Sequence, residues 1–467
     1  MHLDPNSAGS PGMKESRAPA GSRSPQAKTV SGIERFLRRH GYFLLFLFVL
    51  GFGVYNLYLS ILPLDFDNVY ALHMAARTGF LGLLKGVRFA YPPSPFYRPV
   101  AHATMMLQYR IWGLDTTYYF LLNLLVWIAC SWGIYGVVAY VSKSRTSAAA
   151  AAAFLLLDPR AAQALYWIQE RQTSLCVLFG VAALLLAMMP ARRPRSRLRW
   201  VAIFLLLVAS PLSKEYGLAF MGSLILLAAF RKDHEWKALI AIALLAAGAY
   251  GVIRFLSGIT NYTDYCETMG FFQQVHQVCY SSLDLGARLQ QHAYNVGSSF
   301  VGTVLPGLFG VYGEMDPRLQ QILIVDTPML LLALFGLVKS PRETFPLLAL
   351  VILNAILCFV LYRPRNQLVG VLGLYAAAGI GLSHLLRAPL LDRHVSLRWP
   401  VLLALTTILS LQTVQATHLM VGKYEEVQHL DPCKYSPVAQ VDPDIVYQIK
   451  IRFGLRDPRC RDLSGGG

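Results

Sequence analysis

The chain contains 467 residues, of which 55% are hydrophobic and only 15% are charged, and its mean hydropathy is +0.44. Soluble proteins carry about 25% charged residues, so this chain lacks the polar surface that several water-facing domains need. The composition excludes a soluble enzyme as the main body, and it excludes a disordered or fibrous chain. The long apolar runs predict an all-α, polytopic helical membrane protein.

Basic residues outnumber acidic ones, with 42 Lys+Arg against 26 Asp+Glu and a net charge of +16. In a soluble protein this excess would indicate nucleic-acid binding. Here most of the cations lie in short segments between apolar runs, where membrane topology and anionic lipid head groups explain them. We therefore expect the lipid bilayer as a partner, and no nucleic acid.

Apolar runs of helical length fill most of the chain after residues 1–40, which we interpret as a disordered cytoplasmic N-terminal tail. The first predicted span is Tyr42–Pro63, and together the runs give about eleven transmembrane helices within residues 41–420. The further predicted spans are 117–141, 146–157 extending toward 167, 172–190, 199–212, 216–230, 238–256, 322–338, 344–361, 367–386 and 399–418.

Basic residues are concentrated in every second loop. Five loops that we place inside total 39 residues and hold 15 Lys+Arg, whereas five that we place outside total 121 residues and hold only 11. The inner loops are 142–146, 190–199, 231–237, 339–343 and 387–398, and the outer ones are 64–98, 158–171, 213–215, 257–320 and 362–366. Because cytoplasmic loops are enriched in Lys and Arg, we expect a plasma (inner) membrane protein with a cytoplasmic N-terminus.

An odd number of spans places the C-terminus outside, so residues 421–467 are predicted to form an extracytoplasmic tail. The outer segments 64–116 and 257–320 are the longest loops. The first contains 98–113, which is too short to span and which mixes apolar with polar residues. We expect such segments to form amphipathic helices in the outer loops, at the membrane surface.

Four of the seven cysteines lie in segments that we place outside, and the other three lie within predicted spans. The outer four are Cys266, Cys279, Cys433 and Cys460. An even number outside fits disulfide formation in an oxidising exterior. Four cysteines allow three pairings, of which Cys266–Cys279 with Cys433–Cys460 is the simplest; four free thiols are the alternative.

No metal or cofactor site is predicted. His276 and Cys279 are three residues apart, but nothing else in that loop completes a tight ligand set. The sequence therefore gives no support to a divalent metal.

Two carboxylates, Asp65 and Asp67, directly follow the first predicted span. A carboxylate at an apolar boundary has a raised proton affinity, which suits a general base for a hydroxyl group. The alternative is a helix cap or a turn, since Asp and Asn favour both.

Further ionisable residues interrupt the predicted outer turns. They are Asp158 and Arg171 in one turn, Lys214 and Glu215 in the next, and Arg363 and Arg365 in a third. Such groups are costly near a membrane unless they are paired or used. Lys214 and Glu215 would hold their turn in the simpler interpretation, and the arginines would anchor helices. Alternatively, guanidinium groups grip phosphate, and a sugar transfer from a lipid phosphate needs a base, cations and an apolar groove.

Residues 60–230 resemble the GT-C superfamily of glycosyltransferases that use polyprenyl-phosphate sugars, and in particular the protein O-mannosyltransferase-like enzymes and the transmembrane tetratricopeptide O-mannosyltransferases. The motifs that carry the resemblance are Phe66-Asp67-Asn68, Arg98-Pro99 through Trp112-Gly113, Tyr119 to Asn123, Asp158-Pro159 with Trp167 and Arg171, and Ser213-Lys214-Glu215. The chain departs from the family pattern at Phe120, Asn68, Asp158 and Gln163. It also lacks the tetratricopeptide array, so acceptor recognition must differ.

The resemblance implies an inverting transfer of a sugar, such as the hexose mannose, from a polyprenyl phosphate to a hydroxyl of a protein or glycolipid on the outer face. It implies Asp67 as the base with Asp65 beside it. The donor phosphate would be bound by Arg171, Lys214, Arg363 and Arg365, with support from Arg98, Asn123, Asp158 and Glu215.

Two other functions fit parts of the sequence. The departures from the family pattern fit a catalytically inactive relative or an assembly subunit. The many apolar runs fit a transporter or flippase of lipid-linked sugars, but such a protein places ionisable groups near the middle of the membrane. Here the predicted spans are nearly free of central charges, which favours the enzyme.

Overall fold

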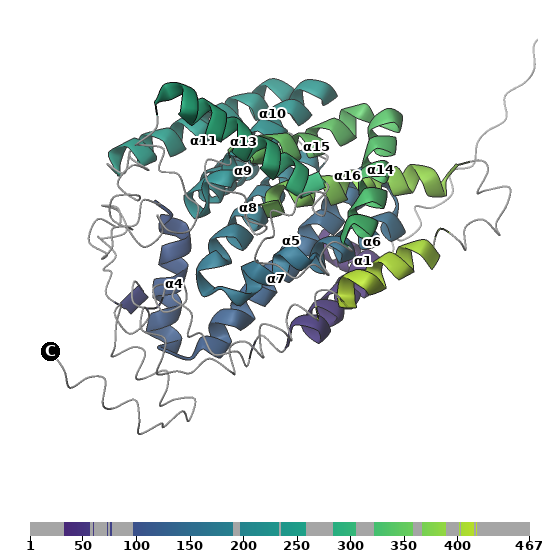
Figure 1. Ribbon diagram of the computed structural model, residues 1–467, viewed down its shortest axis with the longest axis horizontal. Coiled ribbons are helices and arrows are strands. Elements are labelled where there is room, and N and C mark those ends of the chain that lie inside the picture. The colour runs from purple at the N-terminus through teal and green to yellow at the C-terminus, as the bar shows by residue number, and fades with distance from the viewer. Residues whose placement is uncertain are drawn as a thin grey trace, which may run out of the picture. The chain divides into compact units, whose positions relative to one another are not determined.

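Figure 1 shows the computed structural model of the chain. Contacts divide the chain into Met1–Gly41 and Tyr42–Gly467, and of the first unit only the beginning of one helix is described. Apart from a few isolated positions, the structure describes residues 32–56, 97–189, 197–232, 235–257, 284–304, 322–357, 367–388 and 403–414.

The described residues form helices and no strands, as the sequence predicts. The helices are α1 (Gly32–Tyr55), α4 (Pro99–Trp112), α5 (Thr116–Ser142), α6 (Arg145–Leu156), α7 (Pro159–Tyr166), α8 (Arg171–Met188), α9 (Arg197–Ser213), α10 (Leu218–Arg231), α11 (Trp236–Leu256), α13 (Leu285–Val304), α14 (Ile322–Lys339), α15 (Pro341–Ile356) and α16 (Leu368–Leu386). Two 3₁₀ turns, η2 (Ile168–Glu170) and η3 (Glu215–Gly217), lie between them, and a further apolar helix covers Leu403–Val414.

Four of the described helices are long and apolar enough to cross a membrane: Thr116–Ser142, Ile168–Met188, Trp236–Leu256 and Leu368–Leu386. Others that coincide with predicted spans are too short. The 12 residues of α6 extend over about 18 Å, whereas the hydrocarbon core is about 30 Å thick. The helix ends there because Pro159 follows and begins α7. The molecule is a helical membrane protein, and the count of about eleven spans is not confirmed.

Helix α16 lies in the core, where it packs against α5, α6, α14 and α15. Every residue from Leu368 to Ser383 is buried. A Cβ atom at Gly381 would overlap the carbonyl oxygen of Leu332, so only glycine lets α14 approach this closely. Small residues at helix contacts are the usual means of tight packing in a membrane, where van der Waals contact rather than water exclusion drives association.

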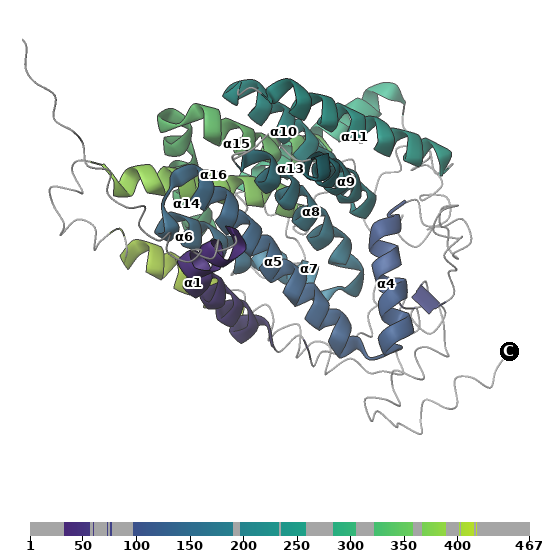
Figure 2. The same ribbon diagram turned by 180° about the vertical axis from the view of Figure 1, so that it is seen from behind.

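Two of the predicted inner loops, 142–146 and 339–343, lie close to the end of α16. The Ser383 hydroxyl on α16 donates to the Ser142 carbonyl at the end of α5, at 3.2 Å. Nearby along the chain, Ser340 Oγ lies 2.6 Å from His384 Nε2. Figures 1 and 2 show α5 running through the body of the molecule, where α6 and α8 each pack against it. These contacts hold the end of α16 close to the end of α5 and the start of α15.

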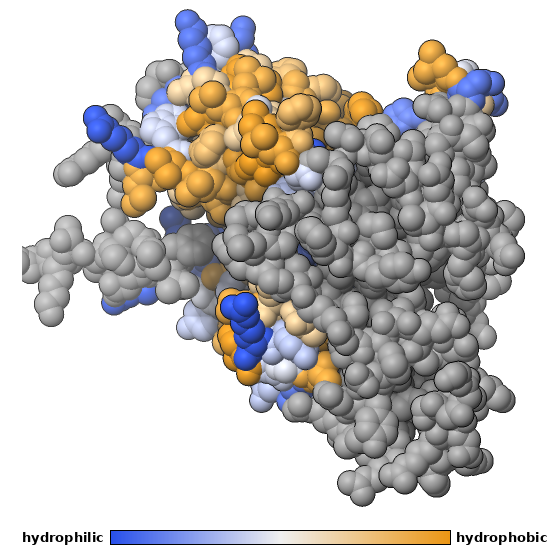
Figure 3. Space-filling view, turned by 90° about the vertical axis from the view of Figure 1, so that its left-hand side faces the viewer, coloured by the Kyte–Doolittle hydropathy of each residue, from blue (hydrophilic) through white to orange (hydrophobic). Residues whose placement is uncertain are grey.

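Apolar side chains cover much of the described surface on the side shown in Figure 3. On α11 the exposed large residues are Leu244, Leu245, Val252, Phe255 and Leu256. Exposed apolar areas of this kind suit contact with lipid chains.

Candidate functional site at the helix termini

Helix α4 corresponds to the predicted surface segment 98–113. Pro99 occupies its first turn, where a missing N–H costs nothing. Gly113 ends it with a φ of 55°, a left-handed conformation that favours glycine, and α5 begins three residues later. The helix packs against α5, α8 and α9 and leaves Leu107 and Ile111 exposed, which agrees with an amphipathic helix.

Arg98, directly before α4, forms an ion pair with Glu215 at the start of η3. Its Nη2 donates to Glu215 Oε2 at 2.8 Å, and its Nε lies 3.3 and 3.2 Å from the two carboxylate oxygens. This fork holds the beginning of α4 against the turn between α9 and α10. The side chains are 8% and 18% exposed, so water screens the pair only weakly.

The charge of Arg98 also affects its neighbours. Burial of the Glu215 carboxyl acts to raise its pKa, but the charge of Arg98 and its hydrogen bonds outweigh this, and the pKa lies below its ordinary value. Burial, and then the charge of Arg98, lower the pKa of His102 to about 4. At neutral pH, Glu215 is therefore an anion and His102 is uncharged.

Glu215→Gln is expected to destabilise the protein at pH 7 by about 1–3 kcal/mol, since a charged hydrogen-bond acceptor is lost from a largely buried pair. The folded-state pKa of Glu215 is depressed, so its contribution is complete above the ordinary carboxyl pKa of 4.5 and is lost as the pH falls through the folded value. Thermal unfolding of both proteins between pH 4 and 7 checks this. A stability difference that grows toward acid pH would contradict it.

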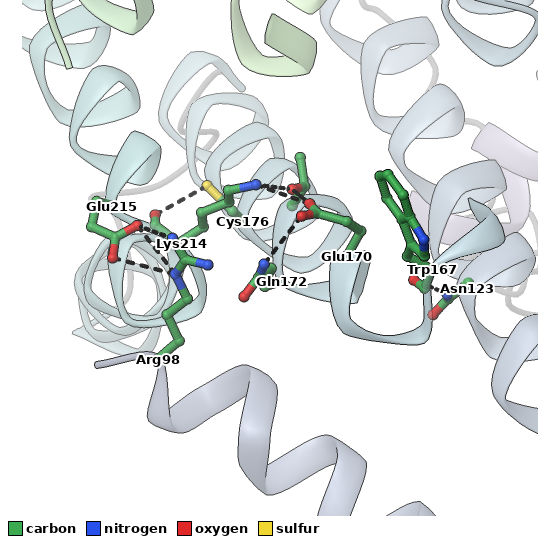
Figure 4. A network of polar contacts seen from close by, with 9 residues as sticks. Arg98, Asn123, Trp167, Glu170, Gln172, Cys176, Lys214 and Glu215 are labelled. Atoms are coloured by element: carbon green, nitrogen blue, oxygen red, sulfur yellow. Dashed lines mark hydrogen bonds and ion pairs between the residues drawn. The ribbon is translucent and has the colours of Figure 1, made fainter. Parts of the chain in front are cut away.

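Lys214 is held by a second carboxylate, Glu170 of η2 (Figure 4). Its Nζ donates to Glu170 Oε2 at 2.9 Å and to Thr173 Oγ1 at 2.6 Å. The Thr173 hydroxyl in turn donates to Glu170 Oε2 at 2.5 Å, and Gln172 Nε2 donates to Glu170 Oε1 at 3.3 Å. All four side chains are buried. The predicted outer turns 158–171 and 213–215 are thus joined by a buried ion pair.

Arg171, the first residue of α8, is fully buried and points toward α5. Its Nε donates to Asn123 Oδ1 at 2.7 Å, and its Nη2 donates to the Tyr119 carbonyl at 2.9 Å. The Asn123 amide donates to the carbonyls of Leu165 and Trp167, at 3.3 and 3.2 Å, and so fixes the turn before α8. Within the described part of the chain, Arg171 pairs with no carboxylate and its Nη1 has no hydrogen-bond partner. An uncompensated buried cation of this kind is costly unless an anion binds there.

Asp158 belongs to a separate network. Arg160 donates to both of its carboxylate oxygens, at 2.8 Å from Nε and 2.6 Å from Nη2, and the Tyr375 hydroxyl donates to Oδ2 at 2.8 Å. Arg160 Nη1 also donates to the carbonyls of Gly302 and Thr303 at the end of α13, at 3.3 and 3.2 Å. These contacts join α7, α13 and α16. Asp158, predicted as a supporting residue, lies here as part of an interhelical tie.

The structure therefore brings together Arg98, Asn123, Arg171, Lys214 and Glu215 of the predicted site. Other predicted residues lie outside the described part of the chain: Asp65, Asp67, Arg363, Arg365, Cys266, Cys279, Cys433 and Cys460. Among described cysteines, Cys130 and Cys176 are free and buried. In the same part of the chain no group of three His, Cys, Asp or Glu side chains is placed to hold a metal.

Sequence reasoning missed Glu170. It stands next to Arg171, which the family motif singles out, and its partner Lys214 is 44 positions away. One signal was present: a lysine in an otherwise apolar turn needs a counter-ion, and Glu170 is one of the two acids of the neighbouring outer turn 158–171.

The protein is a helical membrane protein, and two ion pairs, Arg98–Glu215 and Lys214–Glu170, form a polar site at the ends of its helices. No protein-family model and no curated protein match the chain. Among solved structures it is similar to the archaeal oligosaccharyltransferase AglB from Archaeoglobus fulgidus, in complex with an inhibitory peptide and a dolichol-phosphate. The TM-score is 0.51 at 13% identity, over 84% of this chain and 56% of that one.

At this identity the similarity concerns the fold, and the chain spans little more than half the length of AglB. The likeness supports a helical membrane fold like that of AglB, and membership of the GT-C superfamily stays a prediction. The closer resemblance to the O-mannosyltransferases stays a prediction.

Proposed function

We propose that the protein transfers a sugar from a polyprenyl-phosphate donor to a hydroxyl group of a protein or glycolipid at the outer face of the plasma (inner) membrane. The observation that carries the proposal is Arg171. It is a fully buried guanidinium that has no carboxylate partner in the described chain, and its Nη1 still lacks an acceptor. A phosphate oxygen supplies both the charge and the acceptor that are missing.

Helix α4 and the first turns of α5 and α8 together suit a polar ligand. Five buried side chains of α4 and of the first turns of α5 and α8 have polar atoms without hydrogen-bond partners: His102, Gln108, Thr116, Arg171 and Ser174. Buried polar groups in native proteins are nearly always satisfied. We infer that a bound ligand with several oxygen atoms, such as a sugar phosphate, satisfies some of them.

The proposed reaction is a single displacement with inversion. The acceptor hydroxyl oxygen attacks the anomeric carbon, and Asp67 takes its proton. The bond between that carbon and the phosphate oxygen breaks, and its electron pair stays on the phosphate. Arg171 and Lys214, with Arg363 and Arg365 as further candidates, stabilise the added negative charge.

Two described carboxylates near Arg171 are poor candidates for the base. Glu170 is paired with Lys214, and Glu215 is paired with Arg98. Nearby cations stabilise the ionised form of a carboxylate and weaken its attraction for a proton. This supports Asp67, with Asp65 as its neighbour, as the base.

The location of the charges favours an enzyme over a transporter. In the four membrane-crossing candidates, acidic and basic residues occur only near the helix ends, at Glu170 and Arg171 in one and at Lys237 and Arg254 in another. A transporter or flippase needs polar groups near the bilayer midplane. The fold likeness to AglB, whose complex contains a dolichol-phosphate and a peptide, supports a lipid-linked donor and a protein acceptor.

The test uses the full-length protein in nanodiscs with radiolabelled polyprenyl-phosphate mannose and a hydroxyl-bearing peptide or glycolipid acceptor. We expect label to appear in the acceptor and polyprenyl phosphate to be released. Binding of polyprenyl phosphate without transfer would instead indicate an inactive relative or assembly subunit. Movement of the intact donor across a liposome membrane would indicate a flippase.

A further inference from the structure

Glu170 is the buried group whose role the proposed reaction does not assign. It precedes α8, so its negative charge lies at the positive end of that helix, beside Arg171. Its carboxylate accepts hydrogen bonds from Lys214, Thr173 and Gln172. A carboxylate with three donors is well stabilised as an anion and does not serve as a proton acceptor.

The contacts around Glu170 fix the position of the Lys214 ammonium. A lysine side chain has four rotatable methylene groups and is intrinsically mobile. Here Nζ is bound to two anchors, Glu170 Oε2 and Thr173 Oγ1, and the anchors are bonded to each other. The backbone of Lys214 is held as well, since its N–H donates to the Ser210 carbonyl at 3.1 Å. The ammonium is therefore kept in one place, beside two residues of the segment that begins α8.

The first turn of α8 thus organises two cations in two directions. Arg171 is directed toward α5, where it meets Asn123 and Tyr119. Glu170 and Thr173 are directed toward the turn after α9, where they meet Lys214 (Figure 4). A phosphate near the start of this helix would lie between a guanidinium and an ammonium.

We propose that Glu170 and Thr173 are positioning residues of the donor site, which hold the Lys214 ammonium charged and directed at the donor phosphate. This rests on the proposed function. As the sugar leaves, the phosphate gains a negative charge, and the ammonium is then shared between Glu170 and the phosphate oxygen. No bond is made to Glu170, and no proton leaves Lys214.

The test measures the affinity of the full-length protein in nanodiscs for farnesyl phosphate, by calorimetry, and the KM and kcat of transfer. Glu170→Gln removes the charge but keeps the shape, and Thr173→Val removes only the hydroxyl. We expect each to weaken farnesyl phosphate binding and to raise the donor KM by about 10-fold or more. Thr173→Ser restores the hydroxyl and should restore affinity.

Glu343→Gln, at the start of α15, is the matched control and should bind like the wild type. If folded Glu170→Gln and Thr173→Val proteins bind normally, Glu170 only stabilises the turn and the inference is wrong. Tighter binding by Glu170→Gln would also overturn it, because Glu170 would then compete with phosphate. If Glu170→Gln does not fold, the farnesyl phosphate affinities of Thr173→Val and Thr173→Ser test the inference by themselves. Wild-type protein that binds no farnesyl phosphate would instead refute the proposed function.

Discussion

Asp67→Asn is expected to slow sugar transfer by about 10²–10⁴-fold, which is the usual contribution of a general base. The asparagine keeps the shape and polarity of the side chain but cannot accept the proton of the acceptor hydroxyl. Donor affinity should change little, since cations elsewhere bind the phosphate. Single-turnover transfer, measured with saturating donor and matched amounts of folded protein, gives the chemical step directly.

Asp65→Asn provides the comparison for this result. We expect a smaller loss, because Asp65 would only adjust the proton affinity of its neighbour or cap a helix. An inactive Asp65→Asn protein beside a nearly normal Asp67→Asn protein would show that the two roles are exchanged. Normal turnover in both would mean that the base lies elsewhere in the chain.

Replacing Arg171 should have the largest effect on donor binding. Arg171→Lys keeps the charge but loses the planar fork, and the unpartnered Nη1 is lost with it. We expect the dissociation constant for farnesyl phosphate to rise by about 10- to 100-fold, as for the loss of a charge-assisted hydrogen bond.

Ligand-induced stabilisation separates this effect from a folding defect. At 100 times its dissociation constant, a ligand stabilises the native state by about 2.7 kcal/mol, and after a 100-fold loss of affinity by about 0.4 kcal/mol. Thermal unfolding with and without farnesyl phosphate should therefore show a shift for the wild type and a shift of about half that size or less for Arg171→Lys. Arg387→Lys, at the other end of the bundle after α16, should keep the full shift. If farnesyl phosphate stabilises Arg171→Lys as much as the wild type, other cations bind the phosphate.

The helices of the described chain could be predicted well because each apolar run is long compared with the turns between them. α5, α8 and α11 begin and end within two residues of the predicted limits. The number of membrane crossings could not be predicted in the same way, because an apolar run crosses the membrane only if it forms one uninterrupted helix that is long enough. The run that begins at 146 is interrupted by Pro159 and gives two short helices, α6 and α7.

Five of the residues predicted for the site lie together in the described chain, but the sequence analysis did not predict how they pair. Lys214 and Glu215 are adjacent, and their adjacency alone suggests that they pair with each other. In the fold they point to different partners, Glu170 and Arg98, which lie in different outer segments. Asp158 shows the opposite case: its partner Arg160 is only two residues away, and this local pair then joins α13 and α16. Long-range pairings depend on how helices pack, which hydrophobic periodicity does not encode.

The hydrogen bonds of the Tyr375 hydroxyl indicate how far the chain can be shortened at its C-terminal side without loss of a buried contact. Gln412, in the helix Leu403–Val414, donates to the Tyr375 hydroxyl at 3.1 Å, and that hydroxyl donates to Asp158. Proteins shortened for structure determination are often trimmed where the last compact helix ends, which here would be near residue 388. Such a cut would remove the Gln412 side chain, and with it a hydrogen-bond donor to the buried Tyr375 hydroxyl. Trimming should therefore stop beyond residue 414.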